Sequence, residues 1–425
     1  MFRHLDFMNK NKLFKIKSGI NWRKEGGVFM ILDPEKKRLY FFNKNISDSV
    51  SNEGIININK DNDDLVRSFL KRKIIQEIDS SKISRDFKNK DFSSPLNITI
   101  QITDNCNLKC IYCHRDSKNT DTIDFSKLGK IISDFRSLNV FNINISGGEP
   151  LLVPEIVEIV KTINDSGMKV TMSSNCTLLT AGLARKLKEA GLSQIQTSID
   201  SENPETHNRL RGFKNAFEKT VKNTFFLKKE NIPFAVVTTL VDQSPKEYAE
   251  IIDLSYKLGA FAHKTNTFIP TPDASIKNIS NLKSFRSIGQ FIDIWKKKKE
   301  KYDGKMLLSA ETMFAIQMGK DYISPPNNLS IFNCGCPAGF LTCAINQKGD
   351  VFPCPFFPGL VLGNIFDDTF KNIWNNKITK KFRNRDAIDI CGKCKYKRDC
   401  GGCRARSFGI FNKLNHRDPY CFRVR

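Results

Sequence analysis

Short stretches in the middle of the chain alternate hydrophobic and polar residues, and longer stretches between them repeat hydrophobic residues at helical spacing. Alternation is typical of strands and the longer repeat is typical of helices. The predicted strands begin near residues 96, 140, 169, 193, 232 and 262. The predicted helices span residues 125–138, 153–166, 181–190, 217–229, 246–258 and 284–301. Six strand–helix units in succession predict an α/β fold with a parallel sheet.

Candidate ligands follow two of these strands directly. The strand over residues 96–103 leads into the segment CNLKCIYC, which contains Cys106, Cys110 and Cys113. The strand over residues 140–146 ends at the glycines of the segment SGGEP, residues 146–150. Ligands of α/β sheets and barrels bind at the carboxyl ends of the strands. We therefore expect both motifs at one site.

The three cysteines indicate a reactive metal centre. A closed structural site normally has four protein ligands, whereas three thiolates leave one position open for a substrate or cofactor. Taken alone, the triplet is also compatible with a zinc site completed by His114 or by a remote cysteine. The position of the triplet at a strand end, together with the glycine motif, favours the reactive cluster.

With these two motifs the chain resembles the radical S-adenosylmethionine (SAM) enzymes. The resemblance implies a curved, partial (β/α)6 barrel and a [4Fe-4S] cluster on the three cysteines, with the fourth iron chelated by the amino and carboxylate groups of SAM. It also implies that Tyr112 lies against the adenine. Gly147 and Gly148 allow the backbone to approach a ligand closely, and Glu149 offers an acceptor for an ammonium group.

The resemblance extends to later strand ends. It implies cofactor contacts from polar residues that end the third and fourth predicted strands, namely Ser173, Asn175, Ser198 and Asp200. The stretch beginning at His207 resembles the family pattern H-x-x-x-R-G, in which a guanidinium pairs with the cofactor carboxylate. The sequence leaves the choice between Arg209 and Arg211 open.

Two positions depart from the family pattern. Cys176 stands where the family usually has glycine, and we expect a small buried side chain there rather than an extra metal ligand. In the segment over residues 268–273, Pro272 replaces a glycine at the end of the sixth predicted strand. Cofactor contacts at that strand end are therefore left unassigned.

The C-terminal part of the chain is rich in cysteine. The run CGKCKYKRDCGGC, residues 391–403, is by itself compatible with a zinc ribbon. The surrounding segments, among them CPAG at residues 336–339 and DPYC at residues 418–421, resemble the SPASM extension of radical enzymes that mature peptides and proteins.

The SPASM resemblance implies two auxiliary [4Fe-4S] clusters, and hence three clusters in all. The distal auxiliary cluster would be held by Cys391, Cys394, Cys400 and Cys421. The proximal one would be held by Cys336, Cys354 and Cys403, with the fourth ligand left open between Cys334 and Cys343. Such clusters accept electrons at potentials set by burial and by hydrogen bonds to sulfur, which suits an oxidative reaction.

The first 95 residues are expected to form a separate unit. Residues 27–32 and 38–43 predict a hairpin around an Asp33-Pro34 turn, and residues 62–78 predict an amphipathic helix. This order resembles the small winged-helix domain that binds leader peptides of ribosomally made natural products, in which a sheet edge accepts a peptide strand. A plain structural extension is the alternative. Residues 82–90 would form the linker.

The chain of 425 residues is long enough for two or three domains. We expect an N-terminal domain over residues 1–95, a radical SAM core over 96–305 and a SPASM domain over 306–425. No segment resembles a signal peptide or a membrane span, which predicts a cytoplasmic protein with no membrane partner. In that reducing compartment, the 13 cysteines indicate metal ligands rather than disulfides.

The net charge is +23, from 68 basic and 45 acidic residues. Such a charge attracts nucleic acids, acidic peptides or acidic proteins. The basic residues are spread along the chain, and the lysine run at residues 296–299 is expected on a solvated helix face. Since no nucleic-acid motif is present, we do not expect a nucleic-acid partner. A basic zinc-ribbon binding module ranks below an enzyme.

The sequence therefore predicts a radical SAM/SPASM oxidoreductase that modifies a ribosomally made precursor peptide. The resemblance implies that reductive cleavage of SAM yields a 5′-deoxyadenosyl radical, which abstracts a substrate hydrogen before a thioether or carbon–carbon crosslink forms. The electron would come from a cellular reductant such as flavodoxin or ferredoxin. The alternative enzymes are a sulfatase-type formylglycine maturase and a radical enzyme of tetrapyrrole or quinone-cofactor synthesis. No general base could be assigned from the sequence.

Overall fold

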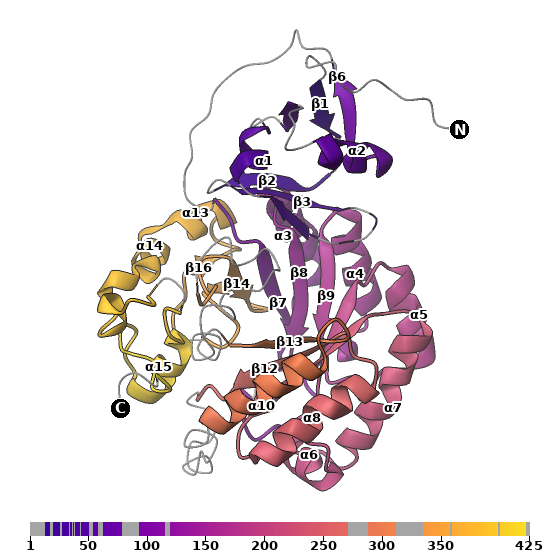
Figure 1. Ribbon diagram of the computed structural model, residues 1–425, viewed down its shortest axis with the longest axis vertical. Coiled ribbons are helices and arrows are strands. Elements are labelled where there is room, and N and C mark those ends of the chain that lie inside the picture. The colour runs from indigo at the N-terminus through magenta and orange to yellow at the C-terminus, as the bar shows by residue number, and fades with distance from the viewer. Residues whose placement is uncertain are drawn as a thin grey trace.

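The computed structural model describes residues 13–17, 20–25, 28–33, 35, 37, 39–42, 44–50, 54–57, 63–78, 93–114, 120–270, 288–311, 335–357, 359–397 and 400–421. Its centre is a sheet of ten strands in the order β13-β12-β11-β10-β9-β8-β7-β14-β15-β16. Strands β7 to β13 run parallel to one another (Figure 1). Their bounds are β7 (Asn97–Thr103), β8 (Asn142–Gly147), β9 (Lys169–Ser173), β10 (Gln194–Ser198), β11 (Phe234–Leu240), β12 (Ala262–Thr267) and β13 (Leu307–Ala310).

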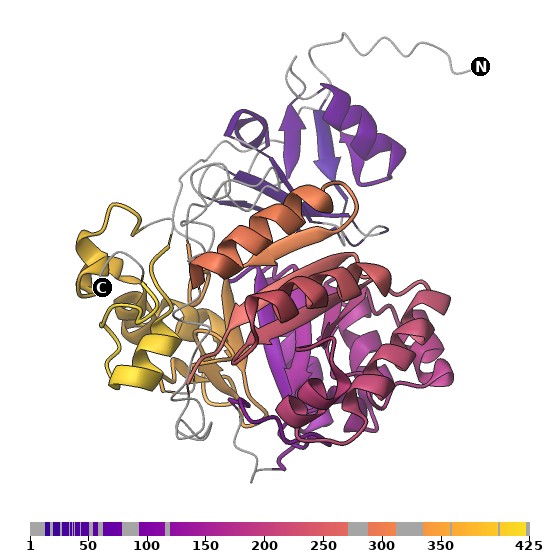
Figure 2. The same cartoon turned by 60° about the horizontal axis from the view of Figure 1, so that its bottom comes forward.

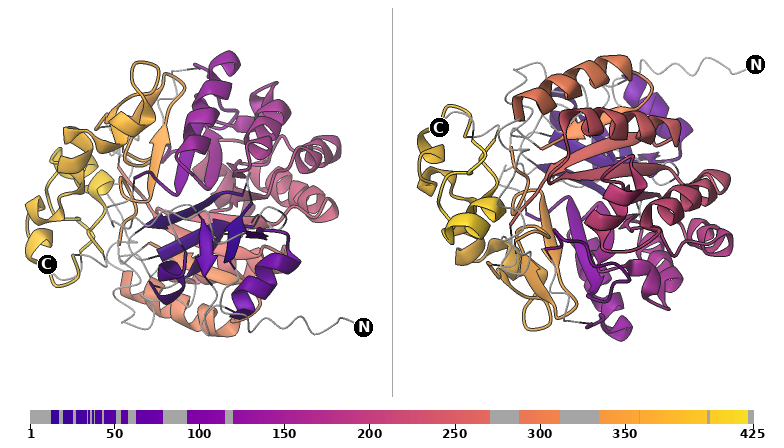
Figure 3. Two further views of the ribbon diagram at one scale, coloured as in Figure 1. Left: turned by 90° about the horizontal axis from the view of Figure 1, so that it is seen from above. Right: turned by 90° about the horizontal axis from the view of Figure 1, so that it is seen from below.

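The predicted helices connect these strands. They are α3 (Phe125–Ser137), α4 (Ile156–Asp165), α5 (Ala181–Glu189), α7 (Ala216–Lys229), α8 (Pro245–Lys257) and α10 (Ile288–Lys301). Residues 284–287 of the last predicted helix lie outside the described residues. Figure 3 shows the helices around the outside of the sheet and the C-terminal segment on its other side. The predicted α/β fold with a parallel sheet is confirmed.

The alternation along each strand explains this arrangement. Ile98, Ile143 and Val170 are fully buried at neighbouring positions of β7, β8 and β9, and they belong to the main hydrophobic cluster that also includes residues of α3 and α4. The residues between them point to the opposite face of the sheet, which we call the inner face. Asn97, Asn142 and Lys169 are neighbours on that face and are only partly buried. The helices therefore cover the apolar face, and the opposite face of the sheet is largely polar.

Several elements were not predicted from the sequence. The helix α6 (Pro204–Arg211) and the short 3-10 helix η2 (Pro150–Leu152) follow β10 and β8. Strand β13 adds a seventh parallel strand next to β12. On the other side of the sheet, β14 (Thr342–Ile345) pairs in parallel with β7, and β15 (Asp350–Phe352) and β16 (Gly363–Asn364) continue as antiparallel strands. The sheet thus runs into the C-terminal part, and the predicted domain boundaries stay a prediction.

The N-terminal unit, the described part of residues 13–78, contains two three-stranded antiparallel sheets. One sheet has the order β2-β3-β4, with β2 at Trp22–Glu25, β3 at Val28–Leu32 and β4 at Leu39–Phe42. The β3–β4 pair confirms the predicted hairpin. The other sheet has the order β5-β1-β6, with β1 at Leu13–Ile16, β5 at Ile55–Asn57 and β6 at Ile75–Ile78. A short helix, α1 (Lys44–Asp48), precedes β5.

The predicted helix over residues 62–78 is wrong in its second half. Helix α2 spans Asp63–Lys71, and the chain then turns at Lys73, which has a positive φ of 55°. The following residues form β6, which pairs with β1 along its length. Ile74 and Ile75 are buried in the core of this unit. Pairing with a strand that lies far away in the sequence overrides the local helical pattern.

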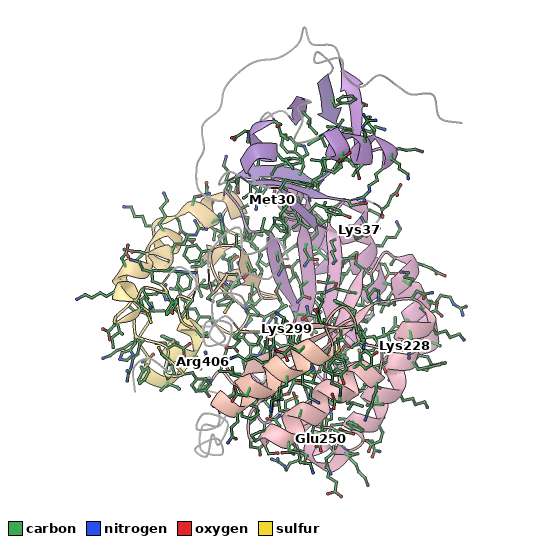
Figure 4. All side chains as sticks on the ribbon, viewed as in Figure 1. Met30, Lys37, Lys228, Glu250, Lys299 and Arg406 are labelled. Atoms are coloured by element: carbon green, nitrogen blue, oxygen red, sulfur yellow. The ribbon has the colours of Figure 1, made fainter. Side chains whose placement is uncertain are left out.

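The N-terminal unit packs against the amino-terminal ends of the barrel strands, as Figure 1 shows above the sheet. A separate apolar cluster joins Val28, Met30 and Leu32 of β3 to Leu96 and Phe141. Figure 4 labels Met30 at this junction. The amide of Asn21 also donates to the carbonyl of Val140 (2.6 Å). The predicted linker at residues 82–90 lies outside the described residues.

The C-terminal block, residues 335–421 as described, combines β14–β16 with short helices. Its helices are α13 (Phe370–Asn375), α14 (Lys377–Arg383) and α15 (Arg404–Phe411), with short 3-10 helices η5 (Arg385–Ala387) and η6 (Cys391–Lys393). Figure 2 shows this block beside the sheet, away from the N-terminal unit. No helix among the described residues is long and apolar enough to cross a membrane.

Candidate functional site

The cysteine loop, residues 104–113, leaves the carboxyl end of β7 and is tied to the end of α6. The amides of Lys109 and Ile111 donate to the carbonyls of Arg211 (3.2 Å) and Leu210 (3.0 Å). The helix ends at Gly212, where φ is +61°. A Cβ at this position would lie 2.1 Å from the carbonyl oxygen of Lys109. The glycine of the H-x-x-x-R-G stretch is therefore required because any side chain at this position would collide with the backbone of the cysteine loop.

Gly147 and Gly148, at the end of β8, pack closely against the backbone at the start of the same loop. A Cβ on Gly147 would lie 2.3 Å from the Thr103 carbonyl oxygen, and one on Gly148 would lie 2.0 Å from the Asn105 carbonyl oxygen. The amide of Gly148 donates to the first of these carbonyls (2.6 Å). The sequence predicts that these glycines closely approach a ligand. In the structure they closely approach the backbone that leads into the cysteines.

Glu149 is fully buried and accepts three hydrogen bonds. They come from the hydroxyl of Ser174 (2.7 Å) and from the amides of Asn175 (2.7 Å) and Leu151 (3.0 Å). Burial raises the pKa of Glu149 to about 6, although these donors oppose the shift. The carboxyl group thereby holds the end of β9 next to the end of β8.

Asn175 connects that strand end to the cysteine loop. Its side-chain amide donates to Asn107 Oδ1 (2.9 Å), and Asn107 lies directly after the first cysteine. Ser173 lies on the inner face, where the amide of Asn144 donates to its hydroxyl (3.2 Å). Asn107 and Asn144 were not predicted. The polar alternation of β8 was the available signal for Asn144.

The fourth strand end forms the most highly charged part of the site. The hydroxyl of Tyr112 donates to Asp200, which also pairs with Arg211 at 2.7 Å. Arg211 in turn lies 3.8 Å from the thiol of Cys110 and packs over the Tyr112 ring. Asp200 and Arg211 are buried, whereas Cys110 and Tyr112 are partly exposed. This network connects the cysteine loop, β10 and α6 through charged groups.

The structure separates the two candidate arginines. Arg209 lies on the exposed surface and pairs with Asp242 at 2.9 Å. Arg211 is buried beside the cysteine loop. Among the described residues, its Nε has no hydrogen-bond partner although it is buried. A buried donor without a partner is costly, so this atom is suited to bind an anionic group of a ligand.

His207 stabilises the backbone at Asp200 through a hydrogen bond. Its Nδ1 accepts from the backbone amide of Asp200 (3.2 Å), which requires an unprotonated Nδ1. Burial and the nearby Arg211 lower the pKa of His207 to about 4. The imidazole is therefore neutral at physiological pH and acts as a support for the strand end. Ser198, two residues earlier, lies on the inner face and is partly exposed.

Cys176 is buried, as predicted, and has a φ of +58°. That backbone conformation favours glycine, which explains the residue that the family usually has here. Burial raises the pKa of its thiol to about 12. Pro272, the other departure from the family pattern, lies outside the described residues.

The three cysteines of the loop provide thiol groups beside the network of Tyr112, Asp200 and Arg211. Burial raises the pKa of Cys110 to about 11, and Cys113 is close enough to interact with it electrostatically. Thiols of this kind lose their protons when they bind a metal, which Arg211 assists by its charge. Within the described residues, no three Cys, His, Asp or Glu side chains converge closely enough to hold a single metal ion. A four-iron cluster places each thiolate on a different iron, and the donor set fits such a group.

The C-terminal thiols fall into neighbouring sets. Cys391 interacts electrostatically with Cys421 and Cys394, and Cys400 interacts with Cys391. Cys336 interacts with Cys354 and with Cys403. Burial raises the pKa of the thiol of Cys354 to about 12. Cys400 also interacts electrostatically with Cys336, so the two sets are adjacent, and the assignment of the cysteines to two clusters stays a prediction.

The two candidates for the remaining ligand differ in position. Cys343 lies on β14, opposite Ile98 of β7, and is fully buried in the main hydrophobic cluster. Burial raises the pKa of this thiol strongly, and Arg383 is the charged group that opposes the shift. Cys334 lies outside the described residues.

Arginines hold the C-terminal block together. Arg385 donates to the carbonyls of Cys336 (2.8 Å) and Lys397 (3.0 Å). Arg406 is fully buried and makes a two-bond contact with Asp418 (2.9 and 2.8 Å). The same carboxylate accepts from the amide of Cys403 (2.7 Å).

Arg406 also reaches the barrel. Its guanidinium donates to the hydroxyl of Thr267 at the end of β12 and pairs with Glu311 at 3.1 Å. Glu311 accepts from the amide of Thr267 (2.7 Å). Figure 4 labels Arg406 where the C-terminal block meets the rest of the protein. One buried side chain thus connects a cysteine of the C-terminal block to the carboxyl ends of β12 and β13.

Comparison with known proteins agrees with this geometry. The family model of the radical SAM superfamily matches residues 100–255, and that of the SPASM iron-sulfur cluster-binding domain matches residues 334–395. An AdoMet-dependent heme synthase of Methanosarcina barkeri is 31% identical over 340 residues, which cover 77% of this chain and 97% of that relative. The mycofactocin maturase MftC of Mycolicibacterium smegmatis is 26% identical over 352 residues, which cover 78% of this chain and 84% of MftC.

A solved structure resembles nearly the whole chain. The crystal structure of Streptococcus suis SuiB bound to the precursor peptide SuiA superimposes with a TM-score of 0.69 and 14% sequence identity. The match covers 96% of this chain and 100% of SuiB, which shows a common fold that includes the N-terminal part. The chain therefore belongs to the radical SAM superfamily of enzymes and carries a C-terminal SPASM iron-sulfur domain.

Proposed function

We propose that this protein is a peptide maturase, which uses SAM and iron-sulfur clusters to install a thioether or carbon–carbon crosslink in a ribosomally made precursor peptide. The observation that carries this proposal is the N-terminal unit. The likeness to SuiB extends over 96% of the chain, and the structure of SuiB contains a precursor peptide. The sequence matches to the heme synthase and to MftC cover less of this chain, 77% and 78%.

The sheet β2-β3-β4 supplies a place for a peptide strand. Among the described residues, β4 pairs with β3 on one side and with no strand on the other. Its residues Leu39 to Phe42 are all partly buried. An unpaired strand edge binds extended peptides through main-chain hydrogen bonds. The proposal assigns leader-peptide binding to this edge.

The barrel end is assigned to the SAM cluster. Cys106, Cys110 and Cys113 would hold a [4Fe-4S] cluster, and the buried, unpartnered Nε of Arg211 supports Arg211 over Arg209 as the partner of the SAM carboxylate. When bound, the cluster and SAM supply a radical that abstracts hydrogen from the substrate. Further SAM contacts are assigned to the residues predicted from the sequence, Tyr112, Gly147, Gly148, Glu149, Ser173, Asn175, Ser198 and Asp200.

The C-terminal block is assigned two auxiliary [4Fe-4S] clusters. Cys391, Cys394, Cys400 and Cys421 would hold the distal one, and Cys336, Cys354 and Cys403 the proximal one. The burial of Cys343 inside the hydrophobic core supports Cys334 as the fourth proximal ligand. These clusters would receive the electron that leaves the substrate when the crosslink forms.

A second candidate function is a radical reaction on a tetrapyrrole. It is favoured by the 31% identity to the M. barkeri heme synthase, which is higher than the identity to MftC. The N-terminal unit would then be a structural addition. In either case we place the protein in the cytoplasm, where flavodoxin or ferredoxin could supply the electron.

The test combines metal content with product analysis. Anaerobically reconstituted protein is expected to hold about twelve iron atoms, the sum of three four-iron clusters. It is then incubated with SAM, a reductant and either the short peptides encoded next to its gene or iron coproporphyrin III. A peptide product with the mass and fragmentation of a crosslink supports the proposal. A porphyrin product with unmodified peptides supports the second candidate, and a formylglycine aldehyde would indicate a sulfatase-type maturase.

A further inference from the structure

The inner face of the parallel sheet is polar over most of its area. Neighbouring strands pair in register, so residues at the same level lie on the same face. The inner-face positions of the parallel strands are Asn97, Thr99, Gln101, Asn142, Asn144, Ser146, Lys169, Thr171, Ser173, Gln194, Gln196, Ser198, Ala235, Val237, Thr239, Ala262, Lys264, Asn266, Leu307 and Ser309. None of these described positions carries a carboxylate.

Lys264 of β12 lies on the inner face, as the contacts of the residues before and after it show. His263 bonds to the hydroxyl of Ser255 (2.9 Å), and Thr265 bonds to the hydroxyl of Tyr248 (2.6 Å). Both partners belong to α8, which covers the outer face. Since side chains alternate along a strand, Lys264 points away from α8.

Lys264 is at the same level of the sheet as a predicted cofactor contact. The register pairs Lys264 with Val237 of β11, and Val237 with Ser198 of β10. Neighbouring strands are about 4.8 Å apart, so the Cα atoms of Lys264 and Ser198 are separated by about 10 Å. Lys264 is therefore close to the end of the sheet that carries the cysteine loop.

The surroundings of Lys264 leave its ammonium group available to a ligand. The side chain is exposed, although desolvation by the surrounding protein atoms lowers its pKa. Among the described residues it has no hydrogen bond or ion pair. The charge that acts on it is Glu311, and this carboxylate is already engaged by Thr267 and Arg406.

Lys169, the other inner-face lysine, differs from Lys264 in its position in the sheet and in having a hydrogen-bond partner. It lies at the start of β9, at the opposite end of the sheet, and its ammonium donates to Gln194 Oε1 (3.2 Å). Among the described inner-face residues, Lys264 is thus a lysine near the cysteine loop without a hydrogen bond or ion pair, and the carboxylate that acts on it, Glu311, is already engaged elsewhere. A buried or half-enclosed charge is stabilised when an opposite charge binds to it.

We propose that the ammonium group of Lys264 binds a carboxylate of the substrate and so sets the position of the substrate on the inner face of the sheet. This inference rests on the proposed radical chemistry at the cysteine loop and deepens it by naming the substrate class, an anionic molecule with at least one carboxylate. The carboxylate belongs to an acidic side chain of a peptide or to a side chain of a tetrapyrrole. Both are recognised by the same ion pair.

The test measures binding to the cluster-loaded full chain with SAM present. One pair of probes is coproporphyrin III and its tetramethyl ester, followed by absorbance. The other pair is dye-labelled hexaglutamate and hexaglutamine, followed by fluorescence anisotropy at about 150 mM salt to screen the surface charges. The variants are Lys264→Met, Lys264→Arg and the control Lys186→Met, an exposed lysine on α5.

The wild type is expected to prefer the carboxylate form of one pair. Lys264→Met is expected to weaken that binding about tenfold or more and to remove the preference, whereas Lys264→Arg keeps most of it and Lys186→Met changes nothing. If Lys264→Met does not fold, Lys264→Gln replaces it. The inference is overturned if the substituted chain binds both carboxylate probes as the wild type does, or if the wild type prefers neither carboxylate probe. Loss of binding for the porphyrin alone sustains the role of Lys264 while overturning the peptide function.

Discussion

The two cysteine-rich regions of this protein are built in different ways. The cysteine loop lies between β7, the glycine turn after β8 and the end of α6, and backbone hydrogen bonds fix it on both sides. The C-terminal segment over residues 384–421 contains two short 3-10 helices and one helix of eight residues, α15. Arginine side chains that bind backbone carbonyls and Asp418 connect its turns.

The difference indicates how each region depends on metal. The loop is held by elements that have a large hydrophobic core of their own. The C-terminal cysteines have fewer strand or helix contacts to hold them, so metal binding is expected to contribute to their folding. The comparison predicts a SAM site formed before metal arrives and auxiliary sites that are completed by it.

The largest effect is expected from Cys110→Ala. This change removes one of the three thiolates that would hold the SAM cluster, and it leaves Arg211 without its thiol neighbour. Production of 5′-deoxyadenosine, measured by liquid chromatography after reduction, is expected to fall to background. Normal production by this variant would contradict the assignment of the loop. The buried Cys176, replaced by Ala, serves as the control because it is not proposed to bind metal.

The next substitution tests whether the two cysteine-rich regions have separate roles in the reaction. Cys394→Ala removes a proposed distal ligand but does not touch the barrel. SAM cleavage is expected to continue, while conversion of the substrate stops because the electron has no acceptor. Both products are measured in the same reaction. Intact conversion of the substrate would refute the role of the C-terminal clusters in the reaction.

Removal of iron tests the structural side of the comparison. The iron-free protein is expected to lose hydrogen-exchange protection by about tenfold or more over residues 391–421, while β7 to β12 keep theirs. Exchange is followed by mass spectrometry of peptides from both forms. Equal protection of the C-terminal segment with and without iron would mean that the arginine contacts alone hold it.

A glycine substitution tests whether the barrel site is fixed by backbone packing. Gly212→Ala adds a Cβ that would lie 2.1 Å from the Lys109 carbonyl, at a φ of +61°. We expect a loss of stability of about 1–3 kcal/mol and weaker SAM binding, because the cysteine loop must move. Unfolding in urea and SAM titration measure the two effects. Gly129→Ala on α3, where a Cβ meets nothing within 4 Å, is the control and should not destabilise the protein.

The last of these effects concerns pH. Desolvation lowers the pKa of the buried His263 to about 3, from an ordinary value of 6.5. Its neutral form therefore favours the folded state, and this stability is present above pH 6.5 and is lost as the pH falls toward 3. Between pH 7 and pH 5 the loss is about 2 kcal/mol.

Urea unfolding of His263→Gln should show a correspondingly weaker dependence on pH than the wild type. An unchanged pH dependence in His263→Gln would mean that this imidazole is not the group that responds.

Sequence patterns predicted the barrel well because each of its elements is local. The six strands and six helices follow from hydrophobic spacing, and each observed strand begins within two residues of its predicted start. The prediction failed at residues 72–78, where pairing with β1 replaced the helix. It also missed β14, which joins β7 across more than two hundred residues of sequence.

Some features of the candidate site were likewise predictable from the sequence, and others were not. The cysteine spacing and the glycine motif identified the loop, and the position of Cys176 was predicted correctly. The sequence could not choose between Arg209 and Arg211, because these neighbours on one helix differ only in the direction they face. It gave no reason to connect Arg406 with Thr267 and Glu311, since a hydrogen bond and an ion pair between distant segments leave no local pattern.

By itself, therefore, the sequence determined the parallel α/β fold, the thiol donors and the family to which the chain belongs, because hydrophobic periodicity and ligand spacing are properties of short segments. Only the tertiary structure decided which arginine lies at the cysteine loop, why the glycines are required, and that Lys264 lies on the inner face without an ion-pair partner among the described residues. These features depend on which strands become neighbours and on which face each side chain occupies. Both are set by packing between residues that are far apart in the chain.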